Sequence, residues 1–119
     1  MKNVIKVLFA LVAIMATATA ATIEITAIKQ IEEDVLIKNT GEDAINLAGW
    51  TLSDEKNHSF VFPDYSLESG EILTVNSKVG NNTDSIIYMQ KTGRGIWNND
   101  HDVATLYNEN GEVMATKKY

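Results

Sequence analysis

The sequence predicts an all-β protein, a single domain built as an antiparallel β-sandwich or barrel. Short runs of β-forming residues recur at intervals of roughly ten residues, the spacing typical of strands in such folds. Turn-forming residues separate the runs, and no helical segment stands between them to make the crossover that a parallel α/β sheet needs. The length of 119 residues allows one domain at roughly 100–200 residues each.

The first three strand-forming groups differ in what ends them. Residues 23–28 alternate between two faces with a period of two, as a half-buried strand does. Residues 35–38 are rich in β-formers and are closed by the turn residues 39–42. In the third group, residues 45–52, Gly49 marks a bend or bulge.

The later groups follow the same pattern. They occupy residues 58–62, 72–75, 86–89, 103–107 and 112–116. Pro63, the only proline, ends the first of them, and Asn110-Gly111, a dipeptide preferred in two-residue hairpin turns, connects the last two. We also expect a strand to begin at Ile96-Trp97.

The N-terminus is predicted to be a secretory signal peptide, residues 1–21, ahead of a folded domain of residues 22–119. Two lysines precede a short apolar run, residues 7–15, and small residues follow it up to Ala21. The alternative is a retained membrane anchor, since the uncharged residues 7–23 number 17, the lower limit for spanning. In either case we expect the folded part to be secreted or at the cell surface.

Charge and cysteine content exclude several function classes. The chain has 10 basic and 16 acidic residues, and removal of Lys2 and Lys6 leaves 8 against 16, a net charge of −8. Nucleic acid is therefore disfavoured as a partner, because its binding depends on Lys and Arg neutralising phosphates. Without cysteine there is no thiol nucleophile or thiolate metal site, and stability must come from an apolar core.

Several segments together resemble a known family, the lamin tail domain. They are residues 35–41, 45–54, 58–63, 67–75 and 97–112, and the resemblance covers nearly all of residues 22–116. Its most specific parts are the Gly49-Trp50 pair and the segment that begins at Trp97. The resemblance implies an immunoglobulin-like β-sandwich and a non-catalytic interaction module. Such modules are known from nuclear lamins and from secreted or surface prokaryotic proteins, often beside hydrolases.

A few residues are singled out for structural or binding roles. Trp50 follows Gly49 within an apolar pattern and is expected in the core, and Gly49 and Asp102 are also expected to be structural. Trp97 has two open interpretations, a core side chain or an exposed anchor for a partner, because tryptophan is enriched at binding hot spots. The candidate binding residues form one segment: Trp97, Asn98, Asn99, Asp100 and His101.

The same polar segment has a calcium interpretation. Asn98, Asp100 and Asp102 alternate as oxygen donors, and Glu109 follows at a spacing that superficially fits an EF-hand loop. However, Val103 stands where that loop needs glycine, and a strand rather than a helix follows. We therefore expect side chains that hydrogen-bond their own backbone, Asp102 above all, with calcium as the alternative.

No catalytic site is predicted. His58 and His101 coexist with Ser53, Ser59 and many carboxylates, but the sequence contains no nucleophile elbow and nothing that indicates an oxyanion hole. Both imidazoles are expected at the surface. We expect no enzyme activity, no cofactor and no metal, and a zinc site at the two histidines would need distant residues to meet.

Three smaller motifs also have interpretations that need no ligand. Residues 93–95, Gly-Arg-Gly, lack the ending and the helix of a phosphate loop and predict a turn. Residues 32–34, Glu-Glu-Asp, predict a solvated turn that discourages edge pairing. Asn57 and Asn81 begin glycosylation sequons, which are open to modification or unmodified.

The leading hypothesis for function is an exported, non-catalytic recognition module that binds an envelope or extracellular protein or glycan. It would contact a membrane only through an uncleaved N-terminus. One alternative is a self-assembling component of the cell surface, because edge strands can pair between copies. Another is an accessory domain associated with nucleic acid or with a hydrolase, which are partners seen beside this family.

Overall fold

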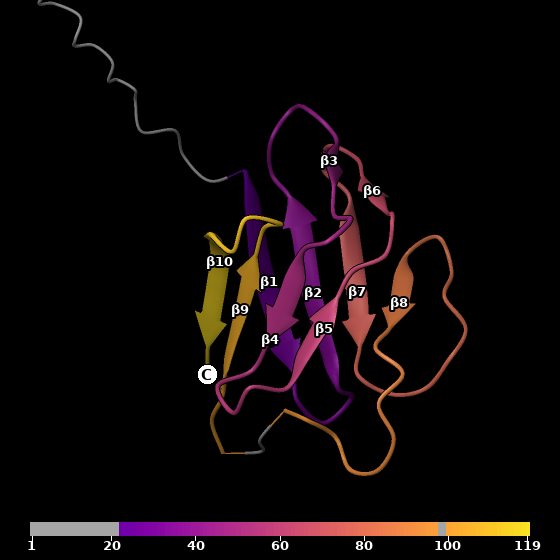
Figure 1. The fold of residues 1–119 in the computed structure, drawn as a ribbon, viewed down its shortest axis with the longest axis vertical. Helices are drawn as coiled ribbons and strands as arrows, with labels where there is room; N and C mark the ends of the chain where they lie inside the picture. The colour runs from indigo at the N-terminus through magenta and orange to yellow at the C-terminus, as the bar shows by residue number, and fades with distance from the viewer. Residues whose placement is uncertain (1–21, 98–99) are drawn as a thin grey trace, which may run out of the picture.

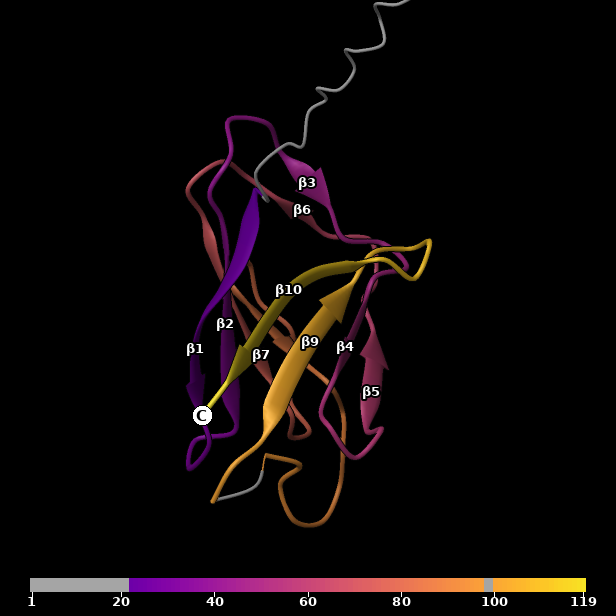
Figure 2. The ribbon, with the colours of Figure 1, turned by 90° about the vertical axis from the view of Figure 1, so that its left-hand side faces the viewer.

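Ten strands make up the regular structure of residues 22–97 and 100–119, the part of the chain that this computed structural model describes. The signal peptide predicted for residues 1–21, together with Asn98 and Asn99, lies outside these residues. Two four-stranded sheets face each other, and a two-stranded ribbon lies at one end of them (Figures 1 and 2). Within the described residues, no helix is long and apolar enough to cross a membrane.

The two facing sheets have simple orders. The first contains, in order, β1 (Ile23–Lys29), β2 (Asp34–Asn39), β7 (Ile72–Asn76) and β8 (Ile86–Tyr88). The second contains β10 (Val113–Lys118), β9 (Val103–Tyr107), β4 (Thr51–Ser53) and β5 (Ser59–Val61). The ribbon pairs β3 (Ile45–Asn46) with β6 (Ser66–Leu67). The predicted all-β sandwich is confirmed.

The core lies between the sheets because alternate residues of each strand point inward. Val35 and Ile37 of β2 are fully buried, as is Leu106 of β9 on the facing sheet. Trp50, just ahead of β4, is buried in the same cluster. Each such side chain contributes roughly 1.5–3 kcal/mol when it leaves water. This burial must supply the stability, since the chain has no cysteine for a disulfide.

The third predicted group divides into two strands, β3 and β4. Leu47 to Trp50 form a tight turn in which the Trp50 amide donates to the Leu47 carbonyl at 2.9 Å. Gly49 has a φ of +80°, a conformation that side chains with a Cβ rarely adopt, so glycine suits this turn. Gly49 thus marks the bend that the sequence predicts, and the chain changes from the ribbon to the second sheet there.

Two features of the topology differ from the sequence prediction. β6 was not predicted, because two residues are too few to show a period. The pair β7–β8 is parallel, whereas all other strand pairs among the described residues are antiparallel. Residues 77–85 carry the chain back along the sheet, so β8 runs in the same direction as β7 instead of forming a hairpin.

Asn39, a buried polar residue, fastens the ribbon end of the sandwich. Its side-chain Nδ2 donates to the backbone carbonyls of Asp43 at 2.8 Å and Leu67 at 2.9 Å. Its side-chain Oδ1 accepts from the Gly41 amide at 2.9 Å. A buried amide with these partners does not carry the penalty of an unpaired polar group. The loop after β2 is therefore held against β6.

Tyr65 joins the ribbon end to the loop before β8. Its hydroxyl donates to the Asp84 carbonyl at 2.7 Å and lies 3.3 Å from the Glu71 carboxylate. Partial burial and then the negative charge of Glu71 raise the pKa of Tyr65 to about 12. The folded protein thus favours the neutral phenol.

This raised pKa predicts a specific loss of stability in alkali. In the unfolded chain Tyr65 ionises near its ordinary pKa of 10.0, whereas in the fold it ionises near 12. Its contribution is therefore complete below pH 10 and is lost as the pH rises toward 12. We expect the difference in unfolding free energy between wild type and Tyr65→Phe, measured with urea, to be constant from pH 7 to about 9.5 and then to shrink. A constant difference through pH 12 would contradict it.

Candidate functional site

An open cleft lies at the end of the sandwich opposite the ribbon. It is surrounded by three segments: the turn between β1 and β2, the residues directly after β7, and the loop before β9. Its volume is about 750 Å³. The cleft is lined by Gln30, Ile31, Glu33, Lys78, Arg94, Gly95, Trp97 and Asp100.

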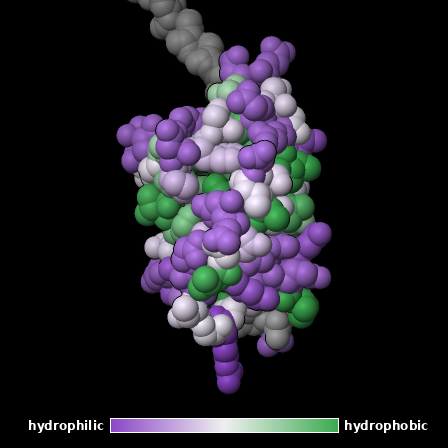
Figure 3. Space-filling view, turned by 90° about the vertical axis from the view of Figure 1, so that its right-hand side faces the viewer, coloured by the Kyte–Doolittle hydropathy of each residue, from purple (hydrophilic) through white to green (hydrophobic). Residues whose placement is uncertain are grey.

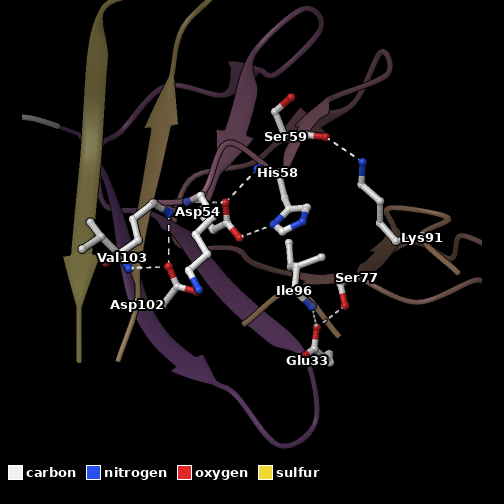
Figure 4. A network of polar contacts seen from close by, with 11 residues as sticks. Glu33, Asp54, His58, Ser59, Ser77, Lys91, Ile96, Asp102 and Val103 are labelled. Atoms are coloured by element: carbon white, nitrogen blue, oxygen red, sulfur yellow. Dashed lines mark hydrogen bonds and ion pairs between the residues drawn. The ribbon is translucent and has the colours of Figure 1, made fainter. Parts of the chain in front are cut away.

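Glu33 holds these three segments together. Its side chain is buried, with 5% of the residue exposed, and its carboxylate accepts hydrogen bonds from the Ser77 hydroxyl and from the Ile96 amide, the latter at 2.8 Å (Figure 4). Its backbone carbonyl also accepts from the Ser77 amide at 3.0 Å. The predicted solvated turn is therefore wrong for Glu33, because a turn with φ of +69° directs this residue inward, where it finds partners.

Gly95 lies directly against the Glu33 carboxyl group. A Cβ placed on Gly95 would overlap that group. Gly93, two residues earlier, has a φ of +85° and makes the turn that the sequence predicts for residues 93–95. Residues 96–97 and 100–102, the described residues between this turn and β9, contain no phosphate-binding helix. Gly95 is thus required for close approach, and Gly93 for the backbone conformation.

Trp97 lies under the loop and is only 3% exposed. Of the two interpretations left open by the sequence, the structure shows the buried one. The strand predicted to begin at Ile96-Trp97 is absent, because the Ile96 amide donates to Glu33 instead of to a neighbouring strand. The indole Nε1 of Trp97 is buried and has no hydrogen-bond partner among the described residues. A buried donor without an acceptor costs roughly 1–3 kcal/mol.

Two cations border the cleft, Lys78 and Arg94. Both residues are exposed, and neither forms an ion pair with a carboxylate in the described part of the chain. Arg94 is the only arginine in the sequence. Ile31, 72% exposed, adds an apolar side chain to the same cleft. The cleft thus offers two positive charges and an apolar contact at a concave surface.

Asp102 is a structural residue beside the cleft region. It is buried, and its Oδ1 accepts from the amides of Val103 at 2.8 Å and Glu55 at 3.1 Å (Figure 4). The predicted bond to the neighbouring backbone is confirmed, and the bond to Glu55 adds a link to the β4–β5 turn. Its carbonyl accepts from the Tyr119 amide at 3.3 Å, so the C-terminal residue lies beside it.

Asp54 orders the β4–β5 turn in a similar way. Its Oδ1 accepts from the amides of Lys56 at 2.9 Å and His58 at 2.8 Å, while its Oδ2 lies 2.6 Å from Nδ1 of His58. The His58 side chain is 51% exposed, whereas that of Asp54 is fully buried. The carboxylate thus orients an imidazole at the surface, an arrangement that sequence reasoning missed.

The described residues do not assemble a recognisable catalytic or metal constellation. His101 lies 3.6 Å from Glu55, whereas His58 is paired with Asp54, and no described serine hydroxyl hydrogen-bonds to either imidazole. Groups of three or more His, Asp or Glu that could hold a metal are absent from the described residues. The calcium interpretation stays a prediction, because Asn98 lies outside them, although the Oδ1 of Asp102 already accepts two amides.

Two described residues of the candidate binding segment line the cleft. Trp97 and Asp100 line it, His101 is directed to Glu55, and Asn98 and Asn99 lie outside the described residues. Binding by this segment stays a prediction. The cleft residues that sequence reasoning did not select come from other segments: Gln30, Ile31, Glu33 and Lys78.

The contact of Gly95 with Glu33 makes a testable prediction about stability. In Gly95→Ala the new methyl group displaces the Glu33 carboxylate from Ser77 and Ile96, and we expect a loss of about 2 kcal/mol of unfolding free energy, measured with urea. In a Glu33→Ala background the same change should cost much less, because the obstructing carboxyl group is gone. Equal costs in the two backgrounds would show that the contact is unimportant.

Comparison with known proteins identifies the family of this sandwich. The family model described as Lamin Tail Domain matches residues 16–119, most of the chain. No curated protein matches. Lamin tail domains are non-enzymatic modules with an immunoglobulin-like fold, in agreement with the two facing sheets seen here. The chain therefore belongs to the lamin tail domain family.

Proposed function

We propose that this protein is an exported, non-catalytic recognition module that binds an envelope or extracellular protein or glycan through the cleft at the loop end. The observation that carries the proposal is a concave surface held in shape by Glu33. It presents Ile31 together with Lys78 and Arg94, whose side chains form no ion pair with any described residue. Binding to a pre-formed surface loses less conformational entropy than binding to a mobile one.

The buried carboxylates support a structural rather than a catalytic use of acidic groups. Glu33, Asp54 and Asp102 each accept at least one backbone amide. A general base or nucleophile instead needs to face a reacting group within a few ångströms. These three carboxylates therefore hold the loop backbone in place. This structural use favours a binding function over a catalytic one.

Two of the four edge strands, β8 and β5, give little support to self-assembly. At β8, the Ile86 carbonyl accepts from the Thr83 amide and the Tyr88 amide donates to Asn82, both from the chain's own loop. At β5, Lys91 donates to the Ser59 carbonyl at 3.0 Å. Figure 3 shows the face of the molecule that lies on the right in Figure 1, where β8 is found. Apolar residues form small patches among hydrophilic ones on this face. At β8 and β5, occupied backbone groups and scattered apolar surface disfavour strand addition between copies.

Export can be tested on the N-terminus of the protein itself. The proposal expects removal of residues 1–21 as the chain leaves the cytoplasm, so the exported form should begin at Thr22. Mass spectrometry of protein from the medium or the cell surface measures this start. An intact Met1 on protein that remains in the cytoplasm would contradict the proposal.

Recognition through the cleft can be tested with two matched variants. Ile31, in the cleft, is 72% exposed, and Val113, at the start of β10 near the other end, is 59% exposed. Replacement of either by Glu should leave folding unchanged, because neither side chain is in the core. We expect Ile31→Glu to abolish binding of the exported protein to extracellular proteins and glycan arrays, and Val113→Glu to retain it. Equal binding by both variants would place recognition elsewhere.

A further inference from the structure

We infer that the ligand of the cleft is a carboxylate-bearing peptide segment, with its acidic side chain held between Lys78 and Arg94. The inference rests on the proposed function and names the chemistry of the partner. In residues 22–119 acidic groups outnumber basic ones by 16 to 8, yet two of the eight bases line this one cleft. In such an acidic chain, two cations that form no ion pair within residues 22–97 and 100–119 attract an anion to this concave surface.

The acidic residues of the cleft do not occupy these cations. The Glu33 carboxylate accepts from Ser77 and Ile96, and neither Glu33 nor Asp100 forms an ion pair with Lys78 or Arg94. An added carboxylate would therefore meet cations that are not already paired. Arginine can bind it with two parallel hydrogen bonds, and lysine adds a point charge.

Trp97 forms a buried part of the cleft wall. It lines the cleft but is only 3% exposed, and its indole N–H is shielded from solvent. A ligand in the open cleft therefore does not reach this N–H. The attraction for a ligand with acceptor oxygens comes from the two cations.

The apolar surroundings favour a peptide over an acidic sugar or nucleic acid. Ile31 is 72% exposed within the cleft, and Val79, 60% exposed, follows Lys78 directly. These side chains can contact aliphatic groups of a peptide. Among the described residues of the lining, Trp97 is the only aromatic one, and it is buried and cannot stack its ring on a sugar or base. Two cations are also few for nucleic acid, whose binding depends on many phosphate contacts.

The test is selection from a random heptapeptide library by the exported protein at low salt. We expect peptides that contain Asp or Glu beside an aliphatic residue to be enriched. Each selected peptide is then compared with its Asn or Gln counterpart by fluorescence anisotropy. The acidic form should bind about tenfold more tightly for each charged contact, and added salt should weaken it.

Matched variants decide whether the two cations are responsible. Lys78→Ala and Arg94→Ala should each lose about tenfold in affinity for the acidic peptide, whereas Lys56→Ala, an exposed lysine outside the cleft, should retain it. Selection of neutral peptides whose binding is abolished by Ile31→Glu would overturn the carboxylate inference and leave the recognition function standing. Binding of oligogalacturonate in place of any peptide would also overturn it. No peptide or glycan binding at all would remove both proposals.

Discussion

Exclusion of water from between the two sheets is the constraint on which the rest of the molecule depends. Strands as short as the three residues of β4 and β5 form few hydrogen bonds of their own, so their position is fixed mainly by what they bury. Leu52 is completely buried, and Phe60 and Phe62 pack edge to face with ring centroids 5.2 Å apart. Because the chain has no cysteine, no covalent link replaces this packing if it is weakened.

Buried polar residues complete the fold where the apolar core ends. Asn39 at one end, and Glu33, Asp54 and Asp102 at the other, each accept or donate hydrogen bonds to loop backbone. A buried polar group without a partner raises the free energy of the fold, whereas a paired one requires a particular geometry. These residues therefore select one loop conformation among many. The cleft is therefore a product of the same polar contacts that close the sandwich.

Local pattern predicted most of the strands but little of the cleft. The period of two in residues 23–28 predicted β1, and runs of β-forming residues between turn signals predicted β2, β7 and β9. The bond from Ile96 to Glu33 joins residues 63 positions apart, and no local period reports such a contact. For the same reason, an acidic tripeptide at residues 32–34 indicated a solvated turn, although one of its members lies inside.

The two ends of the described chain leave the sandwich in opposite directions. Ile23 begins β1 at the ribbon end, while the Tyr119 amide donates to the Asp102 carbonyl (Figure 1). Burial, and then the negative charges of Asp102 and Glu33, raise the pKa of the Tyr119 phenol. Attachment to a bead, a surface or a fusion partner ahead of Thr22 would consequently leave the loop end pointing outward. A tag appended after Tyr119 would instead extend from beside Asp102, two residues along the chain from Asp100 of the cleft lining.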